Sequence, residues 1–242
     1  QSIFKNYTVG DFEKEAIAKL EALFSKNDVA ILVGGSGLYV DAVLKGFDDF
    51  PEIPILIRES VSSQYQELGI DYLQQQLKNL DAVYFEKLTV ENPQTLQNPQ
   101  RMMRFVEVCL GTGKPYSSFL NQKQNERPFA PIVIGLEAER TVLYDRINQR
   151  GDLMIQAGLL EEAKTLFSNK DLNALQTVGY RELFDYFENK ISLPEAIEEI
   201  KKNTRRFAKR QLTWFKRKEN TMWFDYLTPI NEIIQYIETK KM

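Results

Sequence analysis

A short apolar run followed directly by a glycine-rich turn constrains the fold of this chain most. Residues 29–33 (VAILV) are apolar, residues 34–37 (GGSG) form the turn, and residues 38–44 have the apolar spacing of a helix. A short strand, a glycine turn and a helix, in this order, make up the βα unit of a parallel sheet. A second apolar run, at residues 132–136, predicts another strand. We therefore expect an α/β fold with a parallel sheet in its core.

Most of the remaining chain has the periodicity of helices. Apolar residues recur at helical spacing in the segments 11–24, 140–150, 159–167, 179–187 and 193–216. Residues 47–54 carry acids and prolines and predict a linker, after which a mostly helical region continues to about residue 127. We expect an α/β core formed by residues 1–51 and 131–242, which includes the basic C-terminal helices, interrupted by a helical insert at residues 52–130.

Composition excludes several classes of chemistry. The 242 residues contain no histidine and one cysteine, Cys109. A Ser-His-Asp triad, a Cys-His dyad and a histidine-ligated metal are therefore excluded, and a lone cysteine forms neither an internal disulfide nor a structural zinc site. No stretch approaches the roughly 20 apolar residues of a membrane helix, and no secretory signal is present. We expect a cytoplasmic protein without a membrane partner, whose chemistry depends on carboxylates, hydroxyls, arginines, lysines or backbone amides.

Basic residues are concentrated in one segment near the C-terminus. Residues 201–218 (KKNTRRFAKRQLTWFKRK) contain nine lysines and arginines and no acid, although the whole chain has a net charge of −3. On a helix, two basic stripes flank a third that contains Phe207, Gln211 and Trp214. Most charged runs are simply solvated faces, but such faces normally mix both signs in i,i+4 pairs. The segregated charge therefore indicates a polyanionic partner, with nucleic acid as the first candidate.

A second basic cluster lies in the predicted insert, in the segment NPQRMMR at residues 98–104. Asn98 is suited to cap a helix whose first residue is Pro99, and capping alone accounts for both. It does not account for Gln100 and Arg101, whose side chains are suited to base edges or phosphates. The insert therefore offers a second candidate surface for nucleic acid.

The glycine turn itself admits two interpretations. Where a strand ends and a helix begins, glycines let a ligand approach the backbone, and the free amides and the helix dipole favour an anion such as phosphate. A purely structural turn fits the same residues equally well. The turn is not a Walker A loop, because no lysine follows its last glycine, and GxxxxGK[ST] occurs nowhere in the sequence.

Five segments taken together resemble one known family. They occur in the order and approximate spacing of the tRNA dimethylallyltransferases, also called tRNA isopentenyltransferases, and the similarity covers residues 7–225. The segments are ILVGGSGLYVDAVLKG, NPQRMMRFVEVCLGTGKP, IGLEAERTVLYDRINQRGDLMIQAGLLEEAK, TVGYRELFDYF and NTRRFAKRQLTWFKR, of which KRQLTWF is the most specific.

The resemblance implies a P-loop NTPase-like parallel-sheet core with a mostly helical insert, and nucleotide (ATP) binding of the P-loop type. The implied reaction transfers the dimethylallyl group of dimethylallyl diphosphate to N6 of the adenosine on the 3′ side of the anticodon, position 37 of a tRNA. Mg²⁺ would assist the diphosphate. The implied partners are the tRNA anticodon stem-loop and dimethylallyl diphosphate, and we expect a monomer.

Site residues carry over by position. Ser36 stands where the family has threonine in its GGTGLY loop, so the resemblance places it close to the reacting adenine and the diphosphate. Gly34, Gly35 and Gly37 belong to the same substrate loop, and Arg181 matches the arginine taken to bind the diphosphate. The residues that match tRNA-contacting segments are Arg58, Asn98, Pro99, Gln100, Arg101, Met102, Thr204, Arg205, Arg206, Phe207, Ala208, Lys209 and Arg210.

The sequence departs from the family pattern at its start. Family members begin with a phosphate-binding P-loop and then a motif with the aspartate that acts on the adenine amine, whereas this sequence starts near the family's YxxxxF helix, residues 7–12. We therefore expect the N-terminal segment of the family to be absent, and the 242 residues alone not to be a competent enzyme.

Three alternatives stay open. An adenylate isopentenyltransferase would modify a free nucleotide, but the long basic helix and NPQR in the insert favour tRNA. A P-loop nucleotide kinase would use Arg140, Arg146 and Arg150 as an arginine lid, but the missing GK[ST] argues against it. A non-catalytic tRNA-binding fragment differs from the enzyme only in the N-terminal segment.

Overall fold

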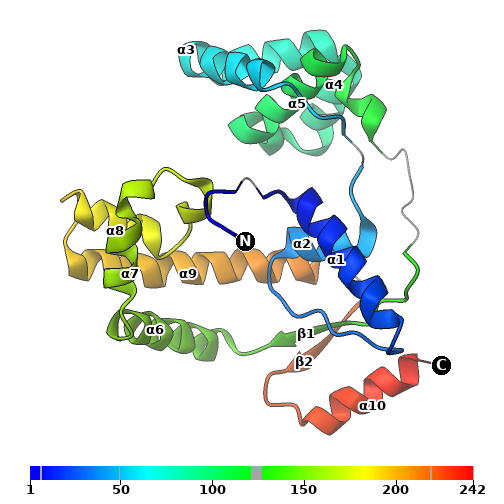
Figure 1. Ribbon diagram of the computed structural model, residues 1–242, viewed down its shortest axis with the longest axis vertical. Coiled ribbons are helices and arrows are strands. Elements are labelled where there is room, and N and C mark those ends of the chain that lie inside the picture. The colour runs from blue at the N-terminus through cyan, green and yellow to red at the C-terminus, as the bar shows by residue number, and fades with distance from the viewer. Residues whose placement is uncertain (6, 49, 121–126, 219, 242) are drawn as a thin grey trace. The chain divides into compact units, whose positions relative to one another are not determined.

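The computed structural model describes residues 1–5, 7–48, 50–120, 127–218 and 220–241. The chain forms two compact units, one of residues 1–44 and 127–242 and one of residues 45–126 (Figure 1). We call them the core unit and the insert unit. The sequence alone placed the boundaries of the insert at residues 52 and 130. No helix in the described part of the chain is long and apolar enough to cross a membrane.

The core unit combines helices with one small parallel sheet. Strands β1 (Val133–Glu137) and β2 (Thr221–Asp225) pair in parallel, with Val133 opposite Thr221. Parallel neighbours need a long crossover connection, and the helices α6 to α9 supply it, so the unit is of the α/β class. The other elements are α1 (Val9–Phe24), α2 (Gly37–Lys45), α6 (Arg140–Gln156), α7 (Leu159–Leu166), η3 (Phe167–Asn169), η4 (Asn173–Leu175), α8 (Tyr180–Phe187), α9 (Leu193–Lys216) and α10 (Ile230–Lys240).

Capping residues determine where two of the longer helices begin. The Thr8 side chain accepts from the Asp11 N–H (3.2 Å), and the Asp11 carboxylate accepts from the Thr8 N–H (2.9 Å). Ser192 and Glu195 form the same reciprocal pair at the start of α9. Each box satisfies N–H groups that the first turn leaves without partners, so α1 and α9 begin close to where the sequence pattern predicts.

The predicted strand at residues 29–33 is wrong. This segment forms no strand, and the described sheet consists of β1 and β2 alone. Ile31 and Val33 are 86% and 87% exposed. The N–H and C=O groups of a strand must pair with a neighbouring strand. The apolar pattern of a single segment does not show whether such a neighbour is present. The other predicted strand is confirmed as β1, one residue later than expected.

Helices α7, α8 and α9 enclose the apolar core of the core unit (Figure 1). The side chains of Leu183 and Phe184 from α8, Ala163 from α7, and Ala196 and Ile200 from α9 are all less than 5% exposed. Burial of each of the larger side chains stabilises the folded state by about 1.5 to 3 kcal/mol. The packing fixes α8 along the N-terminal half of α9.

The insert unit is helical, as the periodicity predicts. Its elements are α3 (Ile55–Leu80), α4 (Ala82–Glu91), η1 (Pro93–Gln97), α5 (Pro99–Thr112) and η2 (Tyr116–Phe119). Gly69 interrupts α3 with φ = 74°, a conformation that favours glycine, and divides it into two helical parts. Asp81 caps α4 by accepting from the Tyr84 N–H (3.1 Å) and also accepts from the Ser117 N–H (2.7 Å). The buried core includes Leu73, Leu77, Met102 and Val106.

Candidate functional site

The glycine turn packs against the basic helix. The carbonyl of Gly35 accepts a hydrogen bond from Gln211 Nε2 of α9 (2.6 Å). Ser36 follows and directly precedes α2, and its carbonyl accepts the first hydrogen bond of the helix, from the Val40 N–H (3.0 Å). The Ser36 side chain is exposed, so its hydroxyl is accessible to a substrate. Two motifs that lie 176 residues apart in the sequence are therefore in contact.

A second contact fastens α2 to the end of α9. The Asp41 carboxylate accepts a hydrogen bond from Trp214 Nε1 (2.9 Å) and forms an ion pair with Lys218. Both side chains of the pair are less than a fifth exposed. A charge pair shielded in this way is screened less than a surface pair. Because Asp41 already has these two donors, we do not assign it as a proton acceptor in the reaction.

At two of the three glycines in the turn, side chains of α9 fill the space that a Cβ would need. A Cβ at Gly35 would lie 1.9 Å from Gln211 Nε2, and a Cβ at Gly37 would lie 2.4 Å from Trp214 Cδ1, whereas a Cβ at Gly34 would meet nothing within 4 Å. None of the three has a positive φ. The need for glycine at these two positions is therefore a need for space, and the neighbouring helix fills that space.

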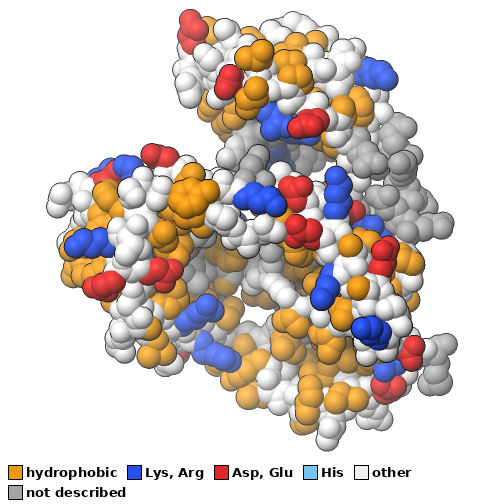
Figure 2. Space-filling view, viewed as in Figure 1, with side chains coloured by type: hydrophobic (Ala, Val, Ile, Leu, Met, Phe, Trp, Pro, Cys, Tyr) orange, Lys and Arg blue, Asp and Glu red, His pale blue; other side chains and the backbone are white. Residues whose placement is uncertain are grey.

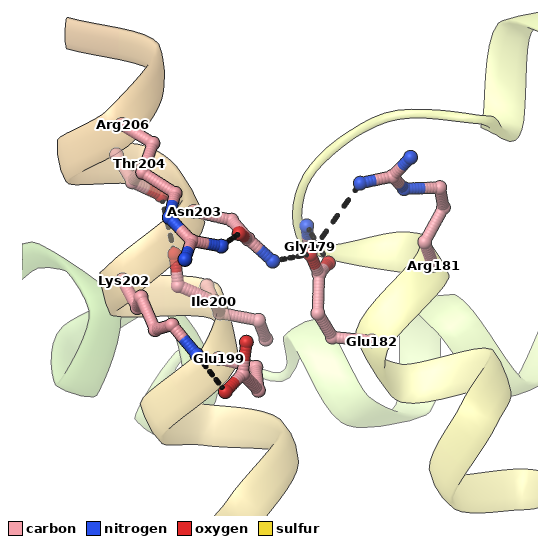
Figure 3. A network of polar contacts seen from close by, with 9 residues as sticks. All are labelled: Gly179, Arg181, Glu182, Glu199, Ile200, Lys202, Asn203, Thr204 and Arg206. Atoms are coloured by element: carbon pink, nitrogen blue, oxygen red, sulfur yellow. Dashed lines mark hydrogen bonds and ion pairs between the residues drawn. The ribbon is translucent and has the colours of Figure 1, made fainter. Parts of the chain in front are cut away.

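Arg181 lies in the first turn of α8, two residues after Gly179, whose backbone conformation favours glycine. Gly179 has φ = 106°, and its N–H donates to Glu182 Oε2 (2.8 Å). The Arg181 guanidinium is half exposed and lies 3.9 Å from Glu182 Oε1 (Figure 3). A guanidinium in this position can contact two oxygens of a phosphate group at once.

Glu182 connects this turn to α9. Its carboxylate is 5% exposed and also accepts from Asn203 Nδ2 (2.8 Å), whose Oδ1 in turn accepts from Arg206 Nη1 (3.2 Å) (Figure 3). A buried carboxylate is costly unless it is hydrogen-bonded, and here two donors satisfy it. Asn203 and Gln211 are eight residues apart, which is about 12 Å along a helix. Helix α9 thus contacts both the Arg181 turn and the Ser36 loop.

An open pocket of about 480 Å³ lies beside the Arg181 turn. Its lining includes Lys170, Glu188, Lys190 and Asn203. Hydrogen bonds from Lys170 and Lys190 lower the pKa of Glu188 to about 2. Carboxylates outnumber cations in the lining, so the pocket interior does not favour an anion, and the Arg181 guanidinium is the group best placed to bind one.

No group of three or more cysteine, aspartate or glutamate side chains in the described ranges is arranged to hold a metal ion. The protein side chains described here therefore form no dedicated cage for the expected Mg²⁺. Magnesium commonly binds through one or two carboxylates together with substrate phosphates.

The basic segment is partly neutralised by acids from other elements. Lys201 pairs with Asp152 (2.8 Å) and Glu198 (3.0 Å), and Lys202 pairs with Glu199 (2.6 Å). Farther along, Lys216 pairs with Glu137 and Lys218 with Asp41. Basic and acidic side chains are likewise interspersed on the face of the molecule in Figure 2. The nine bases therefore overstate the charge that is available to a partner.

Four basic side chains of this segment are exposed and form no ion pair with a carboxylate among the residues that the structure describes. They are Arg206, Lys209, Arg210 and Arg217, and we call them the α9 cationic face. Arg206, Arg210 and Arg217 share one stripe of the helix, since their spacings are four and seven residues.

The other predicted contact residues of α9 lie close to this face. Arg205 is half-buried and donates to Asn148 Oδ1 (2.5 Å), and Thr204 donates to the Ile200 carbonyl (2.7 Å). Phe207 is 50% exposed, and the Arg210 guanidinium lies 5.7 Å from its ring centroid. Ala208 is half-buried.

In the insert unit, the predicted contact residues lie at the start of α5. Asn98 accepts from the Arg101 N–H (3.2 Å) as the helix cap, Pro99 is the first helical residue, and Gln100 is exposed. Arg101 is exposed and donates to Thr95 Oγ1 (3.1 Å). Met102 is different. Its side chain is fully buried in the core of the unit, so the expected contact of Met102 with tRNA is corrected to a packing role.

Arg58 lines a shallow groove of the insert unit. It lies in α3 beside Ser62, Gln66, Met103 and Glu107. Its Nε atom is buried and has no hydrogen-bond partner among the described atoms.

Sequence reasoning missed the residues that hold the site together. Asp41, Glu182 and Asn203 act through contacts between elements far apart in the chain, and no local pattern marks them. Helical spacing placed Gln211 and Trp214 on a common stripe with Phe207. It did not predict that Gln211 contacts Gly35 and that Trp214 contacts Asp41.

Comparison with known proteins identifies the family of the chain. The IPP transferase family model matches residues 2–218. The tRNA dimethylallyltransferase of Flavobacterium johnsoniae is 70% identical over 237 residues, which cover 98% of this chain and 77% of that protein. Its counterpart in Flavobacterium psychrophilum is 68% identical over 240 residues, covering 99% of this chain and 78% of that protein.

A solved structure shows the same similarity in three dimensions. The tRNA isopentenylpyrophosphate transferase of Bacillus halodurans is 33% identical and superposes with a TM-score of 0.66, covering 99% of this chain and 76% of that one. The family model and these relatives cover nearly the whole chain. On this evidence the chain belongs to the IPP transferase family.

Proposed function

We propose that this protein transfers a dimethylallyl group from dimethylallyl diphosphate to N6 of adenosine 37 in a tRNA. The observation that carries the proposal is the role of α9. One side of this helix presents the α9 cationic face, and its inner side holds both the Ser36 loop, through Gln211, and the Arg181 turn, through Asn203 and Glu182. The tRNA dimethylallyltransferase of Flavobacterium johnsoniae, 70% identical, supports the same reaction.

The chemistry fits the residues in the core unit. The N6 amine of adenine attacks the allylic carbon, the bond from that carbon to the diphosphate oxygen breaks, and the amine loses a proton. Negative charge grows on the departing diphosphate, so a guanidinium that contacts two of its oxygens stabilises the transition state more than the ground state. Arg181 would supply this contact, and the Ser36 hydroxyl would donate to the diphosphate or accept from the adenine amine.

The tRNA would be held by its phosphates before the adenine is read. The α9 cationic face would neutralise backbone charges, while exposed Gln100 and Arg101 of the insert unit would contact phosphates or unstacked bases. Adenine must leave the stacked loop to reach a reactive pocket. The anticodon stem-loop is therefore the expected minimal RNA partner. We expect the protein to be monomeric and cytoplasmic.

Two parts of the reaction need groups that the described residues do not supply in one place. A carboxylate would serve as the proton acceptor, since the 242 residues contain no histidine. Mg²⁺ would enter with the diphosphate. We propose that residues 1–242 bind the stem-loop through the α9 cationic face and the exposed start of α5.

An acceptor assay tests the proposal. Residues 1–242, and the same residues preceded by a P-loop segment of the family, are incubated with dimethylallyl diphosphate and with either an anticodon stem-loop or AMP. We expect transfer to the stem-loop by the longer form and none to AMP. Transfer to AMP in preference to RNA would favour an adenylate isopentenyltransferase. Stem-loop binding without transfer by both forms would favour a non-catalytic RNA-binding protein.

A further inference from the structure

We infer that Gln211 and Trp214 are positioning residues that seat the Ser36 loop on α9, and that Gly35 and Gly37 are glycines in order to admit these two side chains. The inference rests on the proposed function, because it concerns the loop that carries Ser36. It reverses the usual interpretation of a glycine turn, in which glycine makes room for a phosphate.

Gln211 occupies the space next to Gly35. Its Nε2 donates to the Gly35 carbonyl (2.6 Å), and a Cβ at Gly35 would lie 1.9 Å from the same nitrogen. The amide of Gln211 can swing away from an added methyl group, but only by giving up this hydrogen bond. Gly35 does not have a positive φ, so its backbone conformation is open to other residues and only the space is restricted.

Trp214 makes the second contact, with less freedom to adjust. A Cβ at Gly37 would lie 2.4, 2.5 and 2.7 Å from the indole atoms Cδ1, Nε1 and Cγ. The same Nε1 donates to Asp41 one turn farther along α2 (2.9 Å). The ring is therefore held in place from two sides, and the start of α2 lies directly against it.

These contacts place the reacting loop and the RNA-binding surface on one rigid element. Gln211 directly follows Arg210 of the α9 cationic face. A phosphate bound to Arg210 would therefore lie one residue along the helix from the side chain that holds the backbone next to Ser36. A misplacement of about 1 Å between reacting groups can cost on the order of 100-fold in rate. The two side chains thus determine how accurately Ser36 meets an adenine positioned by α9.

A double-mutant cycle tests this inference, with Gly10→Ala, a change at a glycine of α1 outside the loop, as the control. Single-turnover transfer at saturating stem-loop is measured for Gly35→Ala, Gln211→Ala and the double variant. All are made in residues 1–242 preceded by a P-loop segment of the family, which we call the active form. We expect each single variant to be at least about 10-fold slower. The double variant should be no slower than the worse single, because both changes break the same contact. Gly10→Ala should transfer at nearly the parent rate, since its Cβ would lie 3.7 Å from Thr8 Oγ1, an ordinary contact distance.

Two further measurements separate positioning from general destabilisation. The free energy of unfolding and the stem-loop Kd should change little, so the loss falls on the rate at saturation. Hydrogen exchange at the first hydrogen-bonded amides of α2, those of residues 40–43, measured in residues 1–242, should quicken in Gly35→Ala and Gln211→Ala, and no further in the double variant. This readout needs no activity, so it stands even if the proposed reaction fails.

The opposite pattern would overturn the inference. If Gly35 makes room for a ligand, Gly35→Ala will slow transfer by the same factor with glutamine or with alanine at position 211. Unchanged hydrogen exchange at residues 40–43 in Gln211→Ala would likewise show that this side chain does not hold the loop.

Discussion

Removing the four residues of the α9 cationic face should flatten the salt dependence of RNA binding by a predictable amount. Each neutralised phosphate contributes about 0.7 to 0.9 to the slope of log affinity against log salt concentration. The variant with alanine at 206, 209, 210 and 217 should therefore have a slope that is smaller in magnitude by about 3. If all nine bases of residues 201–218 acted on phosphates, the segment would contribute about 6 to 8.

The assay is fluorescence anisotropy with a labelled anticodon stem-loop over a series of salt concentrations. Lys209→Ala and Lys202→Ala form a matched pair on the same helix. Lys209 has no carboxylate partner in the described part of the chain, whereas Lys202 is paired with Glu199 (2.6 Å). We expect Lys209→Ala to reduce the slope by about 0.7 and Lys202→Ala to leave it nearly unchanged. Equal effects of the two changes, or a change below about 1 for the fourfold variant, would refute the assignment of the face.

Three further predictions concern the core unit. Arg181→Ala should lower single-turnover transfer by about 100-fold with little change in stem-loop affinity, since it removes a contact that strengthens with leaving-group charge; lost RNA binding with normal use of dimethylallyl diphosphate would contradict this role. Ser36→Thr should transfer at nearly the parent rate, whereas Ser36→Ala should be slower by on the order of 10-fold, because it lacks the hydroxyl; an equally active alanine variant removes Ser36 from the site. Hydrogen bonds from Lys170 and Lys190 lower the pKa of Glu188 to about 2, so their stabilising effect is present above about pH 4.5 and is lost as the pH falls toward 2. Urea unfolding should therefore show Glu188→Gln less stable than the parent at pH 7 and equal to it near pH 2, and a constant difference across this range would exclude the ion pairs as its cause.

Local signals predicted the helices well. Residues 193–216 were expected as one helix, and α9 has these bounds because the Ser192 and Glu195 capping box and Pro194 fix its first turn. Asn98 and Pro99 mark the start of α5 for the same reason. These features depend only on residues within one turn of each other.

Features that depend on distant partners were not predictable. Residues 29–33 have the composition of a buried strand, but the described structure provides no neighbouring strand for them. Strand β2 was missed because its pairing with β1 joins Thr221 to Val133, far apart in the sequence. Helix α10 was also missed, although its apolar residues recur at helical spacing.

The candidate site shows the same limit. Ser36 and Arg181 were found through their motifs, and their roles stay predictions. The acids that pair with Lys201, Lys216 and Lys218 come from other elements, so counting charges along residues 201–218 could not reveal them. Gln211 and Gly35 are 176 residues apart, and only the folded chain brings them into contact.

Nucleoside analysis of a modified stem-loop tests the central claim most directly. The active form is incubated with dimethylallyl diphosphate and a stem-loop carrying adenosine or guanosine at position 37, and the digested nucleosides are identified by mass spectrometry. We expect one dimethylallyl group on N6 of adenosine 37 and no product from the stem-loop with guanosine there. A dimethylallyl group on another nucleoside, or equal product from both stem-loops, would contradict the proposed reaction.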